Sequence, residues 1–420
     1  MSPRDYACKR LSTFLEEVAR LKTSEFPYSH SKEALERLNQ LFQRKLDRLQ
    51  GFDSQSDVGV VRRESALALH ALISLLPLVG FIIRSTNVRN AFEVYQPLLD
   101  LASNVLEWDV PLGQRKTRLL LSSEWEYSPF IYSEIVDLPD FVLIGLPAPE
   151  SANPLLVPLA GHELGHRIWA KRRTGDHFEQ RITDEIYTVI SNRWTECQQV
   201  FDLYSIQESE IRNDLFVMEI VGSALSYALR QAEESFCDFI GVRIFGVSYL
   251  YAFSYLLSPN NVGPRTSAYP HLLARIYNIM EAAKQYDVTT PDNWEALFEN
   301  CAEPNFESRD RLVLSIADAA RQAVIQLLID KADSDITVAS IPKPSIEEAQ
   351  RIYERFLLVV PAENAKCLAD ILNAAWLAYE EPDLWNKIPR ISQARDEVLK
   401  ELVLKNIEVF EIEQILREQS

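Results

Sequence analysis

Two histidines one helical turn apart are the residues of this sequence best suited to chemistry. They lie in the segment His162-Glu163-Leu164-Gly165-His166. On a helix, this spacing places both imidazoles on one face, close enough to bind one metal ion. The carboxylate of Glu163 can then reach a metal-bound water without itself being a ligand. Two nitrogen ligands and a neighbouring base are what metal-assisted hydrolysis needs, so we expect Zn²⁺ to be bound here.

The residues around this segment favour a metal over a pair of packed histidines. They are largely apolar: Leu155, Leu156, Val157, Leu159, Ala160, Leu164, Ile168 and Trp169. The helix is therefore expected to be buried, and burying imidazoles and a carboxylate without a partner is costly. A metal ion is the simplest partner. Gly165 leaves space beside the helix for another backbone or a substrate.

A third ligand is expected from a second helix, predicted from about 211 to 245. Glu234 and Asp238 are four residues apart in an apolar stretch of it, so their carboxylates share one face. We predict Glu234 as the ligand and expect Asp238 to accept the other ring N–H of a ligand histidine. Glu233 competes for the ligand role, since it points about 100° away on a helix of ~3.6 residues per turn. The sequence leaves this choice open.

The succession of these motifs, HExxH and then ExxxD, resembles the gluzincin zinc metallopeptidases. The long gap between them is similar to that of the HtpX-like and CAAX prenyl endopeptidase group (peptidase family M48). The resemblance covers roughly residues 140–280. It implies a zinc peptidase that acts on a protein or peptide.

A third segment of that family, S-T-H-P-P-x-x-x-R-I, has a partial counterpart at residues 267–276, which read SAYPHLLARI. Tyr269 stands where the family has histidine and His271 where it has its second proline, whereas Arg275 matches. The resemblance implies that these three residues lie near the substrate or the transition-state oxyanion. They join Glu163 as the expected catalytic residues. Packed side chains in a loop before a helix are the alternative for Tyr269 and His271.

The elements that must position these residues are mostly helical. Glycine is scarce, with 12 residues, and apolar residues recur at helical spacing along most of the chain. Two short apolar segments, 118–122 and 140–146, read as strands. We therefore expect a mainly α (α+β) fold: an N-terminal helical region at 1–117, a metallopeptidase core with a small β-sheet at 118–288, and a C-terminal helical region at 289–420.

The helix that carries the two histidines is predicted to begin near Asn153-Pro154, with asparagine as its cap and proline in its first turn. Pro158 lies inside it and favours a kink or a later start. The strand before it, at 141–146, is expected to be an edge strand that could pair with an extended substrate.

Charge and cysteine content narrow the class of protein. The net charge is −18, and the longest basic run is Lys171-Arg172-Arg173. Nucleic-acid binding needs clustered Lys and Arg, so we expect no nucleic-acid partner. The five cysteines are widely spaced and form no CxxC pair, which argues against disulfides and a zinc–thiolate site. With no secretory leader pattern, these features indicate a cytoplasmic protein.

One segment could be read as a membrane span. Residues 65–83 are ~19 residues without a charge, close to spanning length. They contain His70, Ser74, Pro77 and Gly80. We favour a buried core helix broken near Pro77, and we expect no membrane association.

The function expected from these features is that of a zinc metalloendopeptidase. A metal-activated water would attack a peptide bond, with Glu163 as the general base. Two alternatives stay open: a non-catalytic, zinc-stabilised helical interaction module, and a protease anchored in a membrane by residues 65–83.

Overall fold

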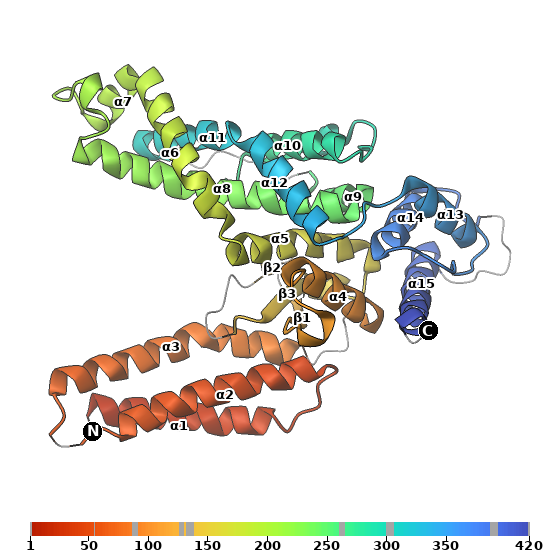
Figure 1. The fold of residues 1–420 in the computed structure, drawn as a ribbon, viewed down its shortest axis with the longest axis horizontal. Coiled ribbons are helices and arrows are strands. Elements are labelled where there is room, and N and C mark those ends of the chain that lie inside the picture. Colours follow the sequence, from red (N-terminus) through yellow and green to blue (C-terminus); the bar gives the residue numbers. More distant parts are fainter. Residues whose placement is uncertain are drawn as a thin grey trace. The chain divides into compact units, whose positions relative to one another are not determined.

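The fold is mainly α with one small sheet, as predicted (Figure 1). The residues of the 420-residue chain that this computed structural model describes are 2–53, 55–85, 91–125, 130–131, 138–259, 265–299, 306–386 and 394–418.

Two compact units divide the chain. The first consists of Met1–Tyr95 and Lys116–Ala152, and the second of Gln96–Arg115 and Asn153–Ser420. Their boundaries differ from those of the three regions expected from the sequence. The strands belong with the N-terminal helices, and the HExxH segment belongs with the C-terminal helices.

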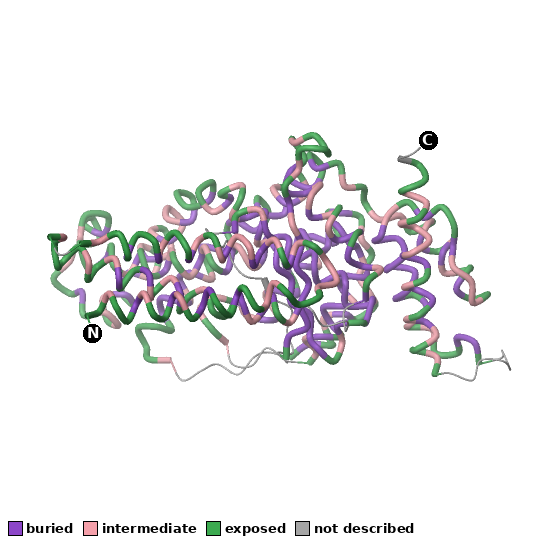
Figure 2. The backbone as a smooth tube through the Cα atoms, turned by 90° about the horizontal axis from the view of Figure 1, so that it is seen from below, coloured by how far each residue is buried: buried purple, intermediate pink, exposed green. Residues whose placement is uncertain are grey.

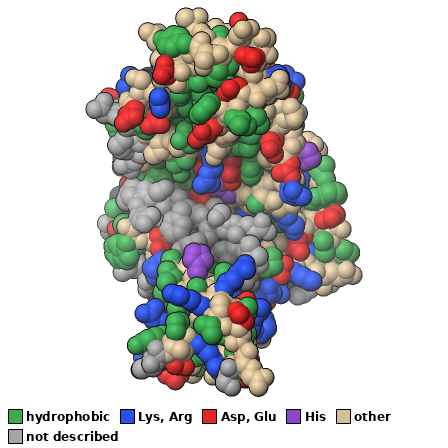
Figure 3. Space-filling model, turned by 90° about the vertical axis from the view of Figure 1, so that its left-hand side faces the viewer, with side chains coloured by type: hydrophobic (Ala, Val, Ile, Leu, Met, Phe, Trp, Pro, Cys, Tyr) green, Lys and Arg blue, Asp and Glu red, His purple; other side chains and the backbone are tan. Residues whose placement is uncertain are grey.

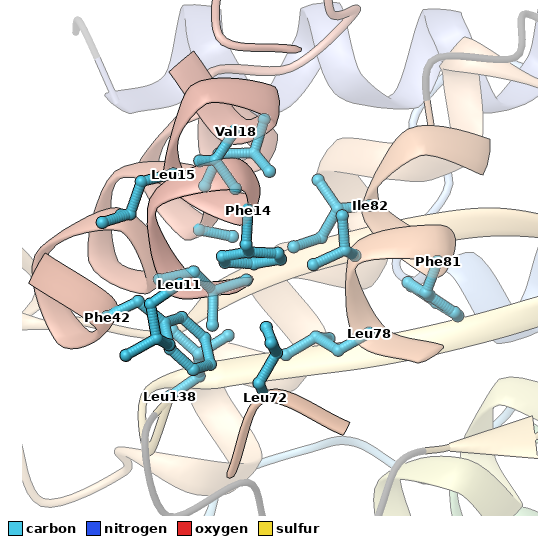
Figure 4. Close-up of a cluster of buried hydrophobic side chains, with 14 of the residues drawn as sticks. Leu11, Phe14, Leu15, Val18, Phe42, Leu72, Leu78, Phe81, Ile82 and Leu138 are labelled. Carbon is cyan, nitrogen blue, oxygen red and sulfur yellow. The ribbon is translucent and has the colours of Figure 1, made fainter. Parts of the chain in front are cut away.

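Three long helices form the core of the first unit: α1 (Pro3–Leu21), α2 (Ser29–Gln50) and α3 (Val58–Arg84). Apolar residues at three- and four-residue spacing give each helix one buried and one exposed face, so colours alternate along them in Figure 2. Phe14 and Phe42 meet edge-on in this core, with ring centroids 4.7 Å apart (Figure 4).

The apolar stretch at 65–83 lies within α3, which is one continuous helix. The predicted break near Pro77 is therefore wrong. Pro77 is on the exposed face, where solvent can satisfy the carbonyl that its missing N–H leaves.

The helix α3 is long and apolar enough to cross a membrane, and 39% of its most apolar window is buried. Phe81 and Ile82 are fully buried in the core of the first unit, whereas Leu67 and Ile73 are 51% and 62% exposed. One face of α3 is thus core and the other is accessible.

Residues 1–95 differ in charge from the chain as a whole. In residues 1–95, Lys and Arg outnumber Asp and Glu, although the chain has a net charge of −18. Lys and Arg side chains are prominent in the lower part of Figure 3. The acidic excess therefore belongs to the residues that follow.

The sheet of the first unit has three strands: β1 (Arg118–Glu124), β2 (Phe130–Ile131) and β3 (Phe141–Pro147), in the order β1-β3-β2. β1 runs parallel to β3, and β2 runs antiparallel to β3. The two strands predicted at 118–122 and 140–146 are confirmed. The expectation of an edge strand at 141–146 is wrong: β3 is the central strand, and it is buried along its whole length, as its continuous apolar run requires.

The second unit is helical in its described residues. Its helices are α4 (Tyr95–Leu106), α5 (Ala160–Lys171), α6 (Thr174–Asn192), α7 (Trp194–Phe201), α8 (Leu215–Phe245), α9 (Val247–Leu257), α10 (Leu272–Gln285), α11 (Ser308–Gln322), α12 (Ile325–Val338), α13 (Ile346–Leu357), α14 (Leu368–Glu380) and α15 (Arg395–Glu418). The longest of them, α8, packs against α5, α6, α10, α11 and α12. It is the scaffold of the unit.

The α-helix that carries the HExxH segment does not begin directly after Asn153, the cap predicted from the sequence. Asn153 caps a six-residue 3₁₀ helix, η4 (Pro154–Leu159), and the α-helix α5 starts at Ala160. Pro158 inside η4 accounts for the delay, since it cannot donate a helical hydrogen bond.

Candidate metal centre

Small residues let the backbones of α5 and α8 approach closely. Gly161 and Gly165, one turn apart on α5, face Gly241 and Cys237 of α8. A Cβ atom at Gly165 would lie 2.6 Å from the Cα of Cys237, and one at Gly161 would lie 2.9 Å from the Cα of Gly241. Any side chain there would push the helices apart. The expectation that Gly165 admits another backbone is confirmed.

This approach brings both histidines of α5 against Glu234 of α8. Nε2 of His162 lies 3.4 Å from Oε2 of Glu234, and Nε2 of His166 lies 3.7 Å from Oε1. One ligand atom from each of the three residues lies within 4.8 Å of the others. Within the described ranges, this is the one trio of His, Cys, Asp or Glu side chains that meets so closely.

The chemistry of these atoms fits a zinc ion. Two imidazole nitrogens and one carboxylate, with a fourth position left for water, are a usual donor set of catalytic zinc. Oε2 of Glu234 is buried and makes no hydrogen bond. A buried carboxylate oxygen needs a cation nearby; in the metal-free protein this is the imidazolium of His162, whose Nε2 lies 3.4 Å away, and a metal ion would take its place. The residues therefore fit Zn²⁺.

The outer nitrogens of both imidazoles are held by carboxylates. Nδ1 of His162 donates to Oδ1 of Asp238 over 2.9 Å, and Nδ1 of His166 donates to Oε1 of Glu233 over 2.9 Å. These bonds fix the tautomers in which both Nε2 atoms are free to bind a metal. The second candidate ligand, Glu233, thus lies behind His166, whereas Glu234 faces both Nε2 atoms.

Asp238 is fully buried and receives several donors. Besides His162, the hydroxyl of Tyr249 donates to Oδ1 over 2.7 Å, and Arg275 donates from Nη2 to Oδ1 (2.8 Å) and from Nε to Oδ2 (2.6 Å). Burial by itself would raise the pKa of Asp238, but the Arg275 guanidinium holds that pKa well below its ordinary value. Asp238 is therefore a carboxylate at neutral pH.

The carboxylates of Asp238 and Glu234 change the pKa of His162 in the metal-free protein. Burial favours the neutral imidazole, but Asp238 and Glu234 outweigh it and raise the pKa of His162 to about 10. A metal must therefore displace a proton from this histidine, which makes metal binding weaker as pH falls.

Glu163 is buried beside the two histidines, 5% exposed. Burial raises its pKa above the ordinary value for glutamate, while the positive charges of the histidines act in the opposite direction. A carboxyl group with a raised pKa next to a metal position is suited to accept a proton from water.

The three residues of the 267–276 segment occupy different positions. Arg275 is buried, and two of its nitrogens bond Asp238, the carboxylate behind His162. Tyr269 is 46% exposed, and its ring lies 5.8 Å from the Arg275 guanidinium. The negative charge of Glu234 and partial burial raise the pKa of Tyr269 to about 12, so its phenol keeps its proton. His271 is the partly exposed residue that precedes α10.

Two contributors to this centre were not predicted from the sequence. Tyr249 reaches Asp238 from α9, and Phe253 lies under the Arg275 guanidinium, 5.0 Å from ring centroid to Cζ. Aromatic residues at this spacing are common in helix cores, so the sequence held no signal for either role. The close approach of α5 and α8 did have a signal: the four-residue spacing of Gly161 and Gly165.

No protein-family model, no curated protein and no solved structure matches this chain. The resemblance to gluzincin peptidases therefore rests on the residues of the motifs alone.

Proposed function

We propose that the chain is a zinc-dependent metallopeptidase of the gluzincin type that hydrolyses peptide bonds of a protein or peptide. The observation that carries the proposal is the convergence of two imidazole Nε2 atoms on Glu234, with a buried Glu163 beside them. A purely structural zinc site needs no such base and usually closes its fourth position with protein.

In the proposed reaction each residue has one role. His162, His166 and Glu234 would hold Zn²⁺, and the bound ion would supply a water of lowered pKa and polarise the scissile carbonyl. Glu163 takes the proton of the attacking water and delivers it to the leaving amine. The phenol of Tyr269 is the available donor for the developing oxyanion, since it is partly exposed and protonated.

The test is Glu163→Gln, which removes the base and keeps the volume. The variant is expected to bind one zinc ion as the natural chain does and to lose roughly 10²- to 10⁴-fold in peptide hydrolysis. Glu219→Gln, the same change at an exposed position of α8, is the control and should leave both properties unchanged. Zinc content and cleavage of a peptide library are the measurements.

The outcomes separate the competing functions. Full activity in Glu163→Gln would rule out the proposed mechanism. A natural chain that binds zinc tightly but cleaves no peptide in the library would favour the non-catalytic interaction module instead.

A further inference from the structure

A single glycine, Gly246, joins α8 to α9. Gly246 ends α8 with φ 64° and ψ −136°, a combination that residues with a side chain rarely adopt. The next residue begins α9, which packs against α8. The turn therefore places the first turn of α9 against α8, where Tyr249 reaches Gly241 and Asp238.

A second glycine makes room for the first aromatic residue of α9. A Cβ atom at Gly241 would overlap the ring of Tyr249, so this ring lies directly against the backbone of α8. Tyr249 is fully buried, and its hydroxyl ends 2.7 Å from Oδ1 of Asp238. A buried hydroxyl is costly without a partner, and a carboxylate is a strong one.

The next turn of α9 contacts Arg275, which forms an ion pair with Asp238. The ring of Phe253, 1% exposed, lies 5.0 Å from the Cζ of Arg275. A guanidinium at this distance from a ring is attracted to it, the more so when water is excluded. Tyr249 and Phe253 thus contact both members of the Asp238–Arg275 ion pair from one face of one helix.

We propose that α9 is a positioning element of the metal centre, acting through Tyr249 and Phe253. The carboxylate of Asp238 has two oxygens, and Oδ1 alone receives the N–H of His162, the hydroxyl of Tyr249 and one N–H of Arg275. Tyr249 restricts rotation of this carboxylate, and the carboxylate in turn fixes the ring of His162 with Nε2 toward Glu234.

This inference rests on the proposed metal centre and predicts how the loss of one hydroxyl group changes its zinc affinity. If Tyr249 only filled space, loss of its hydroxyl would change the stability of the protein and leave the zinc affinity of the folded chain as it was. If it positions Asp238, the same loss weakens zinc binding, because partners behind metal ligands contribute about 10- to 100-fold to affinity.

The experiment compares two tyrosines in the full chain. Tyr249→Phe removes the hydroxyl at Asp238. Tyr286→Phe is the matched control, because its hydroxyl is equally buried but donates to the backbone carbonyl of Ile329 over 2.7 Å. The zinc dissociation constant is measured by competition with a chelating indicator, and the free energy of unfolding is measured on the metal-free protein.

We expect Tyr249→Phe to bind zinc about 10-fold more weakly than the natural chain, and Tyr286→Phe to stay within about 2-fold of it. Unchanged affinity in Tyr249→Phe, or an equal loss in both variants, would overturn the inference. Should Tyr249→Phe not fold, Phe253→Leu tests the same helix through Arg275, with the same outcomes.

The failure of the proposed function is distinguishable from the failure of this inference. A natural chain that binds zinc and cleaves no peptide contradicts the peptidase alone, and the comparison of affinities still decides the role of α9. A natural chain that binds no zinc overturns both.

Discussion

Replacing Gly165 by alanine should disturb both the fold and the metal centre. The added Cβ atom would lie 2.6 Å from the Cα of Cys237 and 3.0 Å from both its Cβ and Sγ. Carbon atoms in contact prefer about 3.5–4.0 Å. The atom in the way is backbone and cannot rotate aside, so α5 and α8 must separate locally by roughly 1 Å, the difference between these distances.

The expected magnitude follows from this displacement. Overpacking of a core costs about 1–3 kcal/mol. Alanine in place of glycine inside a helix returns about 1 kcal/mol, so we expect a net loss of up to about 2 kcal/mol in the free energy of unfolding. Zinc–ligand distances are fixed to within about 0.2 Å, so a shift of roughly 1 Å between the histidines and Glu234 should weaken zinc binding more than about 10-fold.

Urea unfolding of the metal-free chain and zinc competition measure the two effects. Gly222→Ala, in the partner helix α8, is the control, since a Cβ atom there meets nothing within 4 Å. It should stabilise the protein by about 0.5–1 kcal/mol and leave zinc binding unchanged. If Gly165→Ala were as stable as the natural chain and bound zinc as tightly, the close helix approach would not be what forms the centre.

Two further predictions concern ligand choice and pH. Glu234→Gln should weaken zinc binding far more than Glu233→Gln, for which we expect a loss of about 10-fold; the reverse order in a zinc titration would make Glu233 the ligand. Nδ1 of His30 lies 2.6 Å from the hydroxyl of Tyr95, and burial together with the nearby Arg118 charge lowers the pKa of this histidine. Protonation therefore favours the unfolded chain, and stability should fall as pH drops below the ordinary value of 6.5. His30→Gln should reduce that fall between pH 7.5 and 5 in urea unfolding, and an unchanged pH dependence would contradict the assignment.

The sequence predicted those parts of the structure that depend on local spacing. Four-residue spacing was enough to place His162 beside His166 and Glu234 beside Asp238, because helical geometry alone puts each pair on one face. The helical class and the strands β1 and β3 followed from periodicity and flanking residues. The meeting of the two helices was expected from chemistry, since each carried buried polar groups in need of a partner.

The parts that depend on tertiary packing were not predictable in this way. The hydrogen bond from Tyr249 to Asp238 requires the turn at Gly246 and the space that Gly241 leaves for the tyrosine ring. The sequence around these two glycines does not show which residues they will contact. The centre of the sheet is β3 because β2 pairs with it, which its own sequence does not reveal. Arg275 matched a residue of the family segment, but its ion pair with the buried Asp238 could not be predicted from that match.

The most direct test of the central claim is anomalous diffraction at the zinc edge from crystals of the zinc-loaded protein. We predict one strong peak about 2.0–2.2 Å from Nε2 of His162, Nε2 of His166 and a carboxylate oxygen of Glu234, with no protein atom in the fourth position. A map without a peak between these residues, or with a fourth protein ligand closing the site, would contradict a catalytic zinc centre.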